Sequence, residues 1–247
     1  MGRYSLHKVV VPLLFVALAV TLSVVMARIV SHDEERIARF THKPEEVKPE
    51  IPKEIISRYD SIFREVGGKH DVDWVLLAAI ASAESRFKPD AVSRSGATGL
   101  MQVMPSVSRA YGYTREQMFD PYMCTELAAE LLHKLNDQFR FPEGFNGTER
   151  LHFILAAYNA GYSRIAGARR LAQKHGASAS QWSEVEGYLK MLSRPEAARS
   201  VKSRTFHGSR ETIGYVRKVM RLYRSYHERV AKAEKLKTEN GERKTEN

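Results

Sequence analysis

Apolar residues recur at intervals of three and four along most of the chain, which is the spacing of one face of an α-helix. The run 74–85 is apolar on nearly every face and follows Asp73, a residue type that caps helix N-termini. Three prolines stand where a helix can begin, namely Pro52, Pro105 and Pro121. Runs of alternating β-branched residues, which are typical of strands, are missing. The pattern therefore predicts an all-α domain over residues 51–231.

The segments on either side of this domain lack such a period. Residues 28–50 are polar and contain two prolines, which is typical of a linker. Residues 232–247 are charged and contain a repeated Thr-Glu-Asn, so we expect a frayed helix end and a disordered tail there. With the N-terminal segment 1–27, the chain is predicted to divide into four parts.

The N-terminal segment contains an uninterrupted uncharged run. From Val9 to Ala27 there are 19 mostly apolar residues, which as a helix at ~1.5 Å per residue approach the ~30 Å core of a bilayer. Basic residues precede the run, so the N-terminus is predicted to face the cytoplasm and the remainder the outside. The run is either an uncleaved membrane anchor or a signal peptide cleaved near residues 25–27. Both interpretations export the domain.

Charge is spread unevenly along the chain. Lys and Arg total 39 against 29 Asp and Glu, and residues 161–247 hold twenty of the basic and nine of the acidic residues. Such a surface is either a solvated face or one that attracts an anionic partner. Export argues against nucleic acid as that partner. A single cysteine, Cys124, excludes a disulfide framework and a Cys-rich zinc site.

Glu84 is the first candidate for chemistry, because it ends the most apolar helix of the pattern. Three apolar residues lie seven, four and three positions before it and share its face, namely Leu77, Ile80 and Ala81. Apolar neighbours disfavour the charged carboxylate and raise its pKa, which is the property a general acid needs near neutral pH. The alternative is a structural carboxylate that pairs with a nearby cation or points to solvent.

Three further segments present polar groups that suit a sugar. Gly96 and Gly99 permit a tight loop with close backbone approach to a ligand, or form a simple turn beside core methionines. Gly161 looks like a helix stop, which leaves side chains of the last turn free to reach a groove. An acidic residue, Glu211, opens the final helix, where it can also simply favour the helix dipole.

Four motifs in this order resemble the soluble-lytic-transglycosylase (SLT) family of peptidoglycan enzymes: Glu84-Ser85, Gly99-Leu100-Met101-Gln102, Ala157-Tyr158-Asn159-Ala160-Gly161 and Glu211-Thr212-x-x-Tyr215-Val216. Each motif is short, but four in order are specific, and together they cover roughly residues 55–225. Gly161-Tyr162 and the stretch around Trp182 are similar to the catalytic module of membrane-bound lytic transglycosylase F.

The resemblance implies a goose-lysozyme-like α-fold that cleaves the β-1,4 bond between N-acetylmuramic acid and N-acetylglucosamine. It implies a single catalytic carboxylate, Glu84, which acts first as general acid and then as general base and leaves a 1,6-anhydro end without consuming water. The substrate contacts that it implies are Ser93, Gln102, Met104, Tyr158, Asn159 and Glu211. Tyr158 would hold the N-acetyl group or face the developing charge, and Glu211 would place substrate or support the site.

We therefore expect peptidoglycan glycan strands as the partner, a place in the bacterial cell envelope facing the periplasm or outside, and membrane attachment through the N-terminal helix unless it is cleaved. No signature of a metal or nucleotide site is present, so neither a metal nor a cofactor is expected. Two alternatives stay open. A true hydrolase would need a second carboxylate to position water, for which Glu211 or Asp90 is available. A non-catalytic peptidoglycan-binding protein would need no acid at residue 84.

Overall fold

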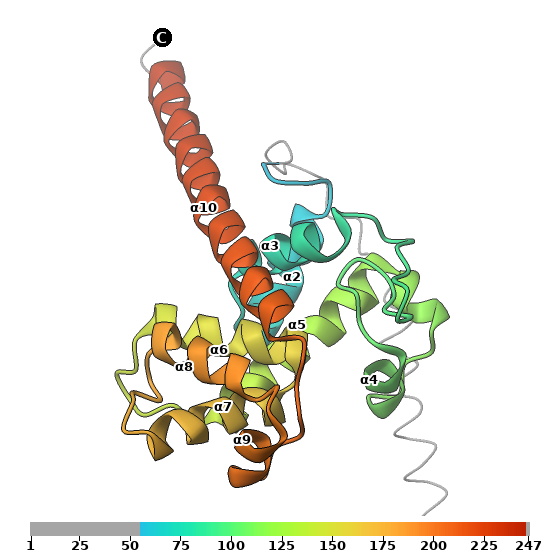
Figure 1. Cartoon of the computed structure of the whole chain (residues 1–247). Coiled ribbons are helices and arrows are strands. Elements are labelled where there is room, and N and C mark those ends of the chain that lie inside the picture. Colours follow the sequence, from blue (N-terminus) through green and yellow to red (C-terminus); the bar gives the residue numbers. More distant parts are fainter. Residues whose placement is uncertain (1–54, 246–247) are drawn as a thin grey trace, which may run out of the picture. The chain divides into compact units, whose positions relative to one another are not determined.

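The computed structural model describes residues 55–245, with side chains up to Leu236. Figure 1 shows that this part is built of helices. In chain order they are α2 (Asp60–His70), α3 (Trp74–Ser85), α4 (Pro105–Ala110), the 3-10 helix η1 (Glu116–Phe119), α5 (Pro121–Phe139), α6 (Gly147–Ala160), α7 (Tyr162–Lys174), α8 (Trp182–Met191), α9 (Pro195–Ser200) and α10 (Ser209–Thr245).

The predicted fold class is confirmed for this part of the chain, where the only β-type pairing is a pair of isolated bridges between residues 92 and 103. Residues 51–247 form a compact unit of their own, and the predicted membrane run and linker lie outside the described residues. Among the helices of residues 55–245, none combines the length and the apolar character needed to cross a membrane.

Local sequence signals set the starts of the central helices. Asp73 caps α3, with its side chain accepting from the Val75 amide at 2.9 Å, as the sequence predicts. Asp120 caps α5 by accepting from the Met123 amide at 2.8 Å. Pro105 and Pro121 occupy the first turns of α4 and α5, where the missing amide hydrogen costs nothing.

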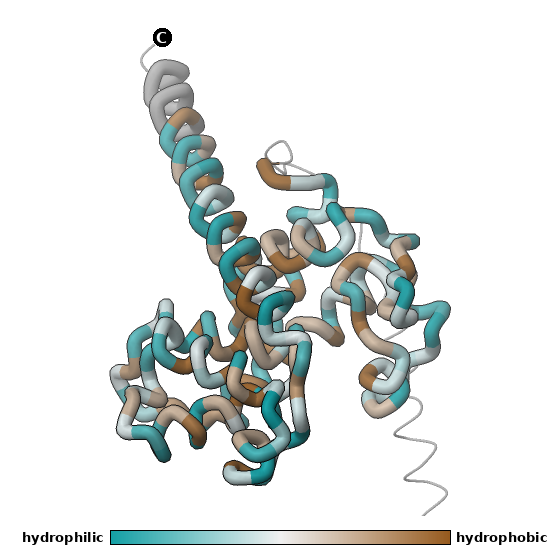
Figure 2. The backbone as a smooth tube through the Cα atoms, viewed as in Figure 1, coloured by the Kyte–Doolittle hydropathy of each residue, from teal (hydrophilic) through white to brown (hydrophobic). Residues whose placement is uncertain are grey.

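Helix α3 lies at the centre of the core. Every residue from Val75 to Ala81 is buried, and α3 packs against both α2 and α10. Burying a leucine or isoleucine side chain contributes ~1.5–3 kcal/mol, so this helix is a large source of stability. Figure 2 shows α10 differently, with apolar and hydrophilic residues mixed along its length.

Polar contacts fasten α10 alongside α3. The Tyr226 hydroxyl donates to Ser82 Oγ at 2.9 Å, and the Tyr223 hydroxyl donates to Asp73 Oδ2 at 2.6 Å. Because these pairs are about 150 residues apart in sequence, they hold the two ends of the domain together. The last helix is therefore part of the scaffold that positions the end of α3.

Helix α10 is longer than the sequence pattern suggests. A frayed end was expected from residue 232, yet the helix continues to Thr245. Lys and Glu dominate this stretch and are good helix formers, and pairs such as Glu228 and Lys232 stand four apart with the acid first, which favours a helix. A helix that is already nucleated on the core needs no core of its own to continue.

Candidate active site

Glu84 stands on the last turn of α3, at the point where the chain leaves the core. The helix ends because Arg86 and Phe87 both take left-handed backbone angles, with φ of 55° and 61°. Such angles are unfavourable for residues with a side chain, and they persist where the surroundings enforce them. The turn sends residues 88–104 back across the end of α3, beside Glu84.

This returning loop is anchored by groups from α3 and α5. The buried Ser85 hydroxyl lies 2.8 Å from the Leu100 carbonyl and 3.1 Å from the Ala81 carbonyl, so it links the loop to its own helix. The Met101 amide donates to Cys124 Sγ at 3.3 Å. The second residue of the Glu84-Ser85 motif thus fixes the loop that faces the carboxyl.

Gly99 has a structural reason to be glycine. Its φ is +80°, and a Cβ atom there would lie 1.8 Å from the Met118 carbonyl oxygen. The sequence suggested close approach of this backbone to a ligand, whereas the structure shows close approach to the backbone around η1. Only glycine allows the loop to pack this tightly.

Two of the predicted substrate contacts also brace this loop. Gln102 has a φ of 51°, and its side-chain nitrogen donates to the carbonyls of Ala91 and Gly99, both at 3.0 Å. Ser93 Oγ accepts from the Ala97 amide at 2.9 Å. The donors of Gln102 are therefore engaged within the protein, which leaves its carbonyl oxygen as the group available to a ligand.

Two phenol groups from distant helices surround the Glu84 carboxyl. Tyr158, near the end of α6, donates from its hydroxyl to the Met101 carbonyl at 2.9 Å. Tyr215, in the second turn of α10, is buried. Burial, and then the charge of Glu84, raises the pKa of both tyrosines well above the ordinary value. Both phenols are therefore neutral donors at physiological pH.

The Glu84 carboxyl itself titrates near neutrality. Burial raises its pKa from the ordinary value of 4.5 to about 7, and the nearby Glu211 adds to that rise. Hydrogen bonding from Tyr215 and the charge of Lys218 act in the opposite direction. Burial is the largest of these effects, so the net shift of the pKa is upward. The raised pKa expected from the apolar stripe is thus found in the folded domain.

The start of α10 brings its own polar groups to this site. Lys218 donates to the Ala83 carbonyl at 2.5 Å, next to Glu84. The buried Thr212 hydroxyl donates to Asn159 Oδ1 at 2.9 Å, which joins the end of α6 to α10. Glu211 is exposed beside them and acts on Glu84 through its charge. Asn159 and Glu211 thus lie where α6 and α10 meet.

A pocket of about 220 Å³ opens beside the loop. Gln102, Met104 and Tyr158 line it, together with apolar side chains that include Val107, Leu131, Leu135 and Tyr162. Met104 is 40% exposed, which is high for a methionine and fits a residue at the rim of a pocket. Three of the predicted substrate contacts therefore meet in one concave, mostly apolar surface, whereas Ser93 does not line it.

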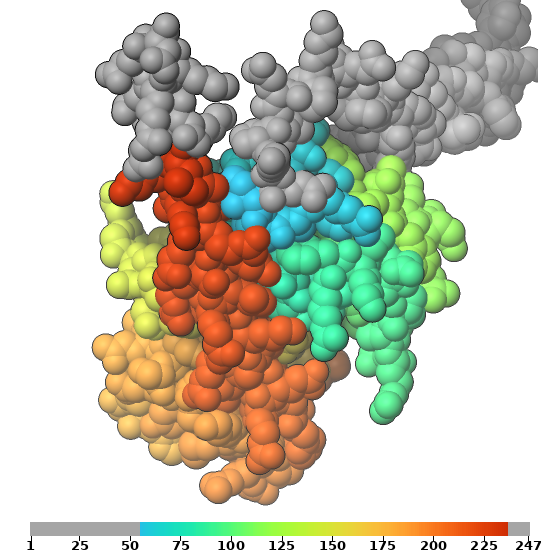
Figure 3. Space-filling view, turned by 90° about the horizontal axis from the view of Figure 1, so that it is seen from above, coloured from blue at the N-terminus to red at the C-terminus, as the bar shows by residue number. Residues whose placement is uncertain are grey.

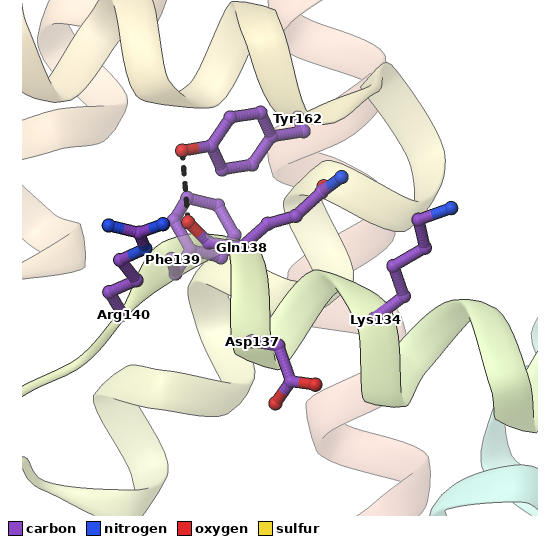
Figure 4. Close-up of a pocket in the computed structure, with 6 residues that line it drawn as sticks. All are labelled: Lys134, Asp137, Gln138, Phe139, Arg140 and Tyr162. Carbon is purple, nitrogen blue, oxygen red and sulfur yellow. Dashed lines mark hydrogen bonds between the residues drawn. The ribbon is translucent and has the colours of Figure 1, made fainter.

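Tyr162 also lines a second, larger pocket, which Figure 4 shows. The Tyr162 hydroxyl donates to the Gln138 carbonyl at 3.1 Å, so the ring is held at the end of α5. The second pocket measures about 590 Å³ and is lined by Lys134, Asp137 and Arg140 among others. None of the predicted site residues lines it.

The structure gives a place at the site to two residues to which the sequence reasoning assigned no role there, although one of them, Tyr215, belongs to the fourth motif. Tyr215 and Lys218 both act on the Glu84 carboxyl. They stand four and seven positions after Glu211, so they share its helical face, and that spacing was the available signal. Among residues 55–236, no group of three or more His, Cys, Asp or Glu is arranged to hold a metal ion.

Comparison with known proteins identifies the family of the domain. Residues 61–181 match the family model for the transglycosylase SLT domain. Residues 61–181 are thus an SLT domain, and the resemblance to the SLT family predicted from the sequence motifs is confirmed. The match ends before α10, so Glu211, Tyr215 and Lys218 lie outside it.

Individual relatives are membrane-bound lytic murein transglycosylases F. The protein from Stutzerimonas stutzeri (strain A1501) is 32% identical over 168 residues, which are 68% of this chain and 34% of that protein. The one from Maricaulis maris (strain MCS10) is 33% identical over 194 residues, 78% of this chain and 40% of that protein. The chain thus spans about a third to two-fifths of these relatives' length. The soluble lytic transglycosylase SLT70 from Escherichia coli is 26% identical, with a TM-score of 0.49 over 68% of this chain and 24% of that one.

Proposed function

We propose that the domain is a lytic transglycosylase with a goose-lysozyme-like fold. It cleaves the β-1,4 bond between N-acetylmuramic acid and N-acetylglucosamine in peptidoglycan and leaves 1,6-anhydro ends. One observation carries the proposal. Glu84 is a half-buried carboxyl with a pKa of about 7, between two neutral phenols and beside a pocket of sugar-binding character. Membership of the SLT family supports it.

The reaction uses Glu84 twice. In its acid form Glu84 donates a proton to the glycosidic oxygen, and the bond to C1 of the muramic residue breaks as positive charge develops on that ring. The resulting carboxylate then takes the proton of the C6 hydroxyl of the same sugar. The C6 oxygen attacks C1 and closes the anhydro ring, so no water is consumed. A pKa near 7 suits a group that must give and then take a proton at neutral pH.

The surrounding residues fit the supporting roles that we assign to them. The Tyr158 hydroxyl donates to the Met101 carbonyl, so its oxygen lone pairs are free to face a positive centre. Met104 and the Gln102 carbonyl line the pocket for the sugar. Asn159 and Glu211, at the junction of α6 and α10, are proposed to place the strand, and Ser93 to contact it through the loop.

The hydrolase alternative rests on Glu211. Its charge acts on Glu84, so it lies close enough to be considered as the second carboxylate that positions a water molecule. Hydrolysis would leave reducing ends instead of anhydro ends. The products therefore separate the two mechanisms directly.

We further propose that the run 9–27 carries the domain into the cell envelope, as an anchor in the inner membrane or as a cleaved signal peptide. The apolar length of this run and the basic residues before it support the proposal. The catalytic domain then faces the periplasm, where its substrate lies.

The test is digestion of purified sacculi by the full-length chain, with mass analysis of the soluble fragments. We expect muramic ends lighter by one water. The Glu84→Gln variant should lose at least about 10³-fold in rate, because it has no proton to donate. Glu143→Gln, at an exposed carboxyl in the loop before α6, is the matched control and should keep full activity. Reducing ends from the intact enzyme would support the hydrolase instead.

A further inference from the structure

A large pocket lies on the other side of α10 from Glu84. It measures about 680 Å³ and is formed by the end of α8, the segment before α10 and the first turns of α10. In Figure 3, α10 (red) crosses the domain between the segment that contains α7 to α9 (orange) and the residues that follow α3 (teal to green). Helix α8 lines this pocket together with Arg210, Gly214 and Arg217 of α10, whereas Tyr215 and Lys218, which act on Glu84, do not line it. The proposed reaction uses none of the pocket's residues.

The pocket is strongly basic. Four of its lining residues are Lys190, His207, Arg210 and Arg217. Arg217 pairs with Glu186 at 2.8 Å. Lys190 and Arg210, by contrast, have no acidic partner among the described side chains. Two cations that face one cavity without counter-charges repel each other, and an anion in the cavity relieves that repulsion.

A glycine in the wall of this pocket keeps the cavity open. Gly214 lies inside α10, where glycine costs ~0.5–1 kcal/mol relative to alanine. A Cβ atom at this position would meet no atom within 4 Å, so packing within the protein does not require glycine. The bare backbone instead leaves room for a ligand against the helix. This contrasts with Gly99, where the protein's own backbone fills the space.

The size and place of the pocket indicate what the anion is attached to. A volume of about 680 Å³ lies in the range of pockets that hold a peptide fragment and far exceeds the needs of a single small ion. Arg210 and Glu211 are adjacent on α10, so the pocket and the catalytic side are separated by about one helix width, ~10 Å. An extended peptide of about three residues spans that distance.

We propose that this pocket binds a carboxylate of the stem peptide carried by the glycan strand that Glu84 cleaves. Arg210 supplies a planar guanidinium that can hold a carboxylate through two parallel hydrogen bonds, and Lys190 supplies a second charge. His207 adds a ring nitrogen that can donate a hydrogen bond. The inference rests on the proposed function, in which Glu84 cleaves the glycan strand. It adds a site for the peptide part of the same substrate.

The experiment measures binding by the full-length Glu84→Gln chain, which does not turn over substrate. The probes are stem peptides released from sacculi by an amidase, the same peptides with amidated carboxyl groups, and glycan strands with and without their peptides. Lys190→Glu with Arg210→Glu is the pocket variant. Lys174→Glu with Lys232→Glu changes the charge equally at exposed positions outside the pocket and is the control.

We expect the pocket variant to bind free peptides and peptide-bearing strands at least about fivefold more weakly than the control variant, since two ion pairs are lost. Its binding to peptide-free strands should match the control. Amidation of the peptides should weaken binding to the parent chain and leave the pocket variant unchanged. Matching thermal unfolding of the two double variants shows that the charge reversals do not act through folding.

Equal peptide binding by the two double variants overturns the inference. So does an equal loss on peptide-free strands, because the charges would then serve the glycan. Displacement of the peptide by inorganic phosphate at equal concentration would show a general anion site and overturn it as well. The proposed function fails separately, if the intact enzyme releases no anhydro ends from sacculi.

Discussion

The two sides of α10 are built in different ways although they belong to the same turns. On the side of Glu84, Lys218 and Thr212 have partners within the protein, and Tyr215 is packed against the carboxyl. On the other side, Arg210 extends into a cavity without a counter-charge, and Gly214 leaves the helix backbone bare.

The difference fits the two roles that we propose for these sides. Catalysis needs a carboxyl held in one place with its pKa already adjusted, so its neighbours must be packed and paired before substrate arrives. Recognition of a flexible, charged peptide needs space and unpaired charge instead. A buried polar group without a partner is costly, so unpaired charges such as those of Lys190 and Arg210 stand at exposed positions.

The largest expected effect concerns the tightly packed loop that Ser85 holds at the end of α3, next to Glu84. Gly99→Ala places a methyl group 1.8 Å from the Met118 carbonyl and forces an unfavourable φ of +80°. We expect the free energy of unfolding to fall by about 2–5 kcal/mol. Denaturant unfolding measures it. Gly176→Ala is the control, because its φ of +74° is similar but no atom lies within 4 Å, and it should cost only about 1 kcal/mol. Equal losses would show that the Met118 contact is unimportant.

The second effect concerns the cost of ionising the Glu84 carboxyl in the folded domain. Glu84 has a pKa of about 7 in the folded domain and about 4.5 when exposed, so the folded state retains its proton over this interval while the unfolded state loses it. Stability contributed by the protonated form is complete below pH 4.5 and is lost as pH rises to 7. Glu84→Gln removes this loss and should raise the free energy of unfolding at pH 8 by up to about 3 kcal/mol.

Unfolding of the two proteins at pH 4 and pH 8 measures this difference. The gain from Glu84→Gln should be larger at pH 8, and the exposed Glu143→Gln should show no such dependence. A gain that is the same at both pH values would mean that burial does not disfavour the Glu84 charge.

The smallest effect concerns the side of α10 that lines the basic pocket. Gly214→Ala should raise the free energy of unfolding by ~0.5–1 kcal/mol, because alanine favours the helix and the new methyl group meets no atom. The same variant should weaken stem-peptide binding by narrowing the cavity. Thermal unfolding and peptide titration measure the two changes. A loss of stability would show that this side of α10 is as closely packed as the other.

Much of the fold could be predicted from periodicity and local signals. The apolar run 74–85 indicated the central helix, Asp73 indicated its cap, and Pro105 and Pro121 indicated the starts of two further helices. These signals depend only on neighbouring residues, so they can be recognised without knowing which elements pack against each helix. The end of α10 was harder to predict, because its length depends on nucleation by the packed part of the helix.

The candidate site could be predicted in part. Glu84 was found because the apolar stripe before it raises the pKa of the carboxyl, and the structure shows this rise. The role of Gln102 in bracing the loop could not be predicted. Its side chain donates to the carbonyl of Ala91, eleven residues away in a loop without regular structure. The roles of Ser93, Asn159 and Glu211 in binding substrate stay predictions.

The sequence by itself determined the helices, the apolar centre and the four motifs, since each depends on residues within a few turns of one another. The tertiary structure decided which distant groups meet. It brought Tyr158 and Tyr215 to Glu84, set Met118 against Gly99, and gathered Lys190 and Arg210 around one cavity. Each contact joins residues with at least one helix between them in the sequence, so the packing of the elements fixes it rather than any local period.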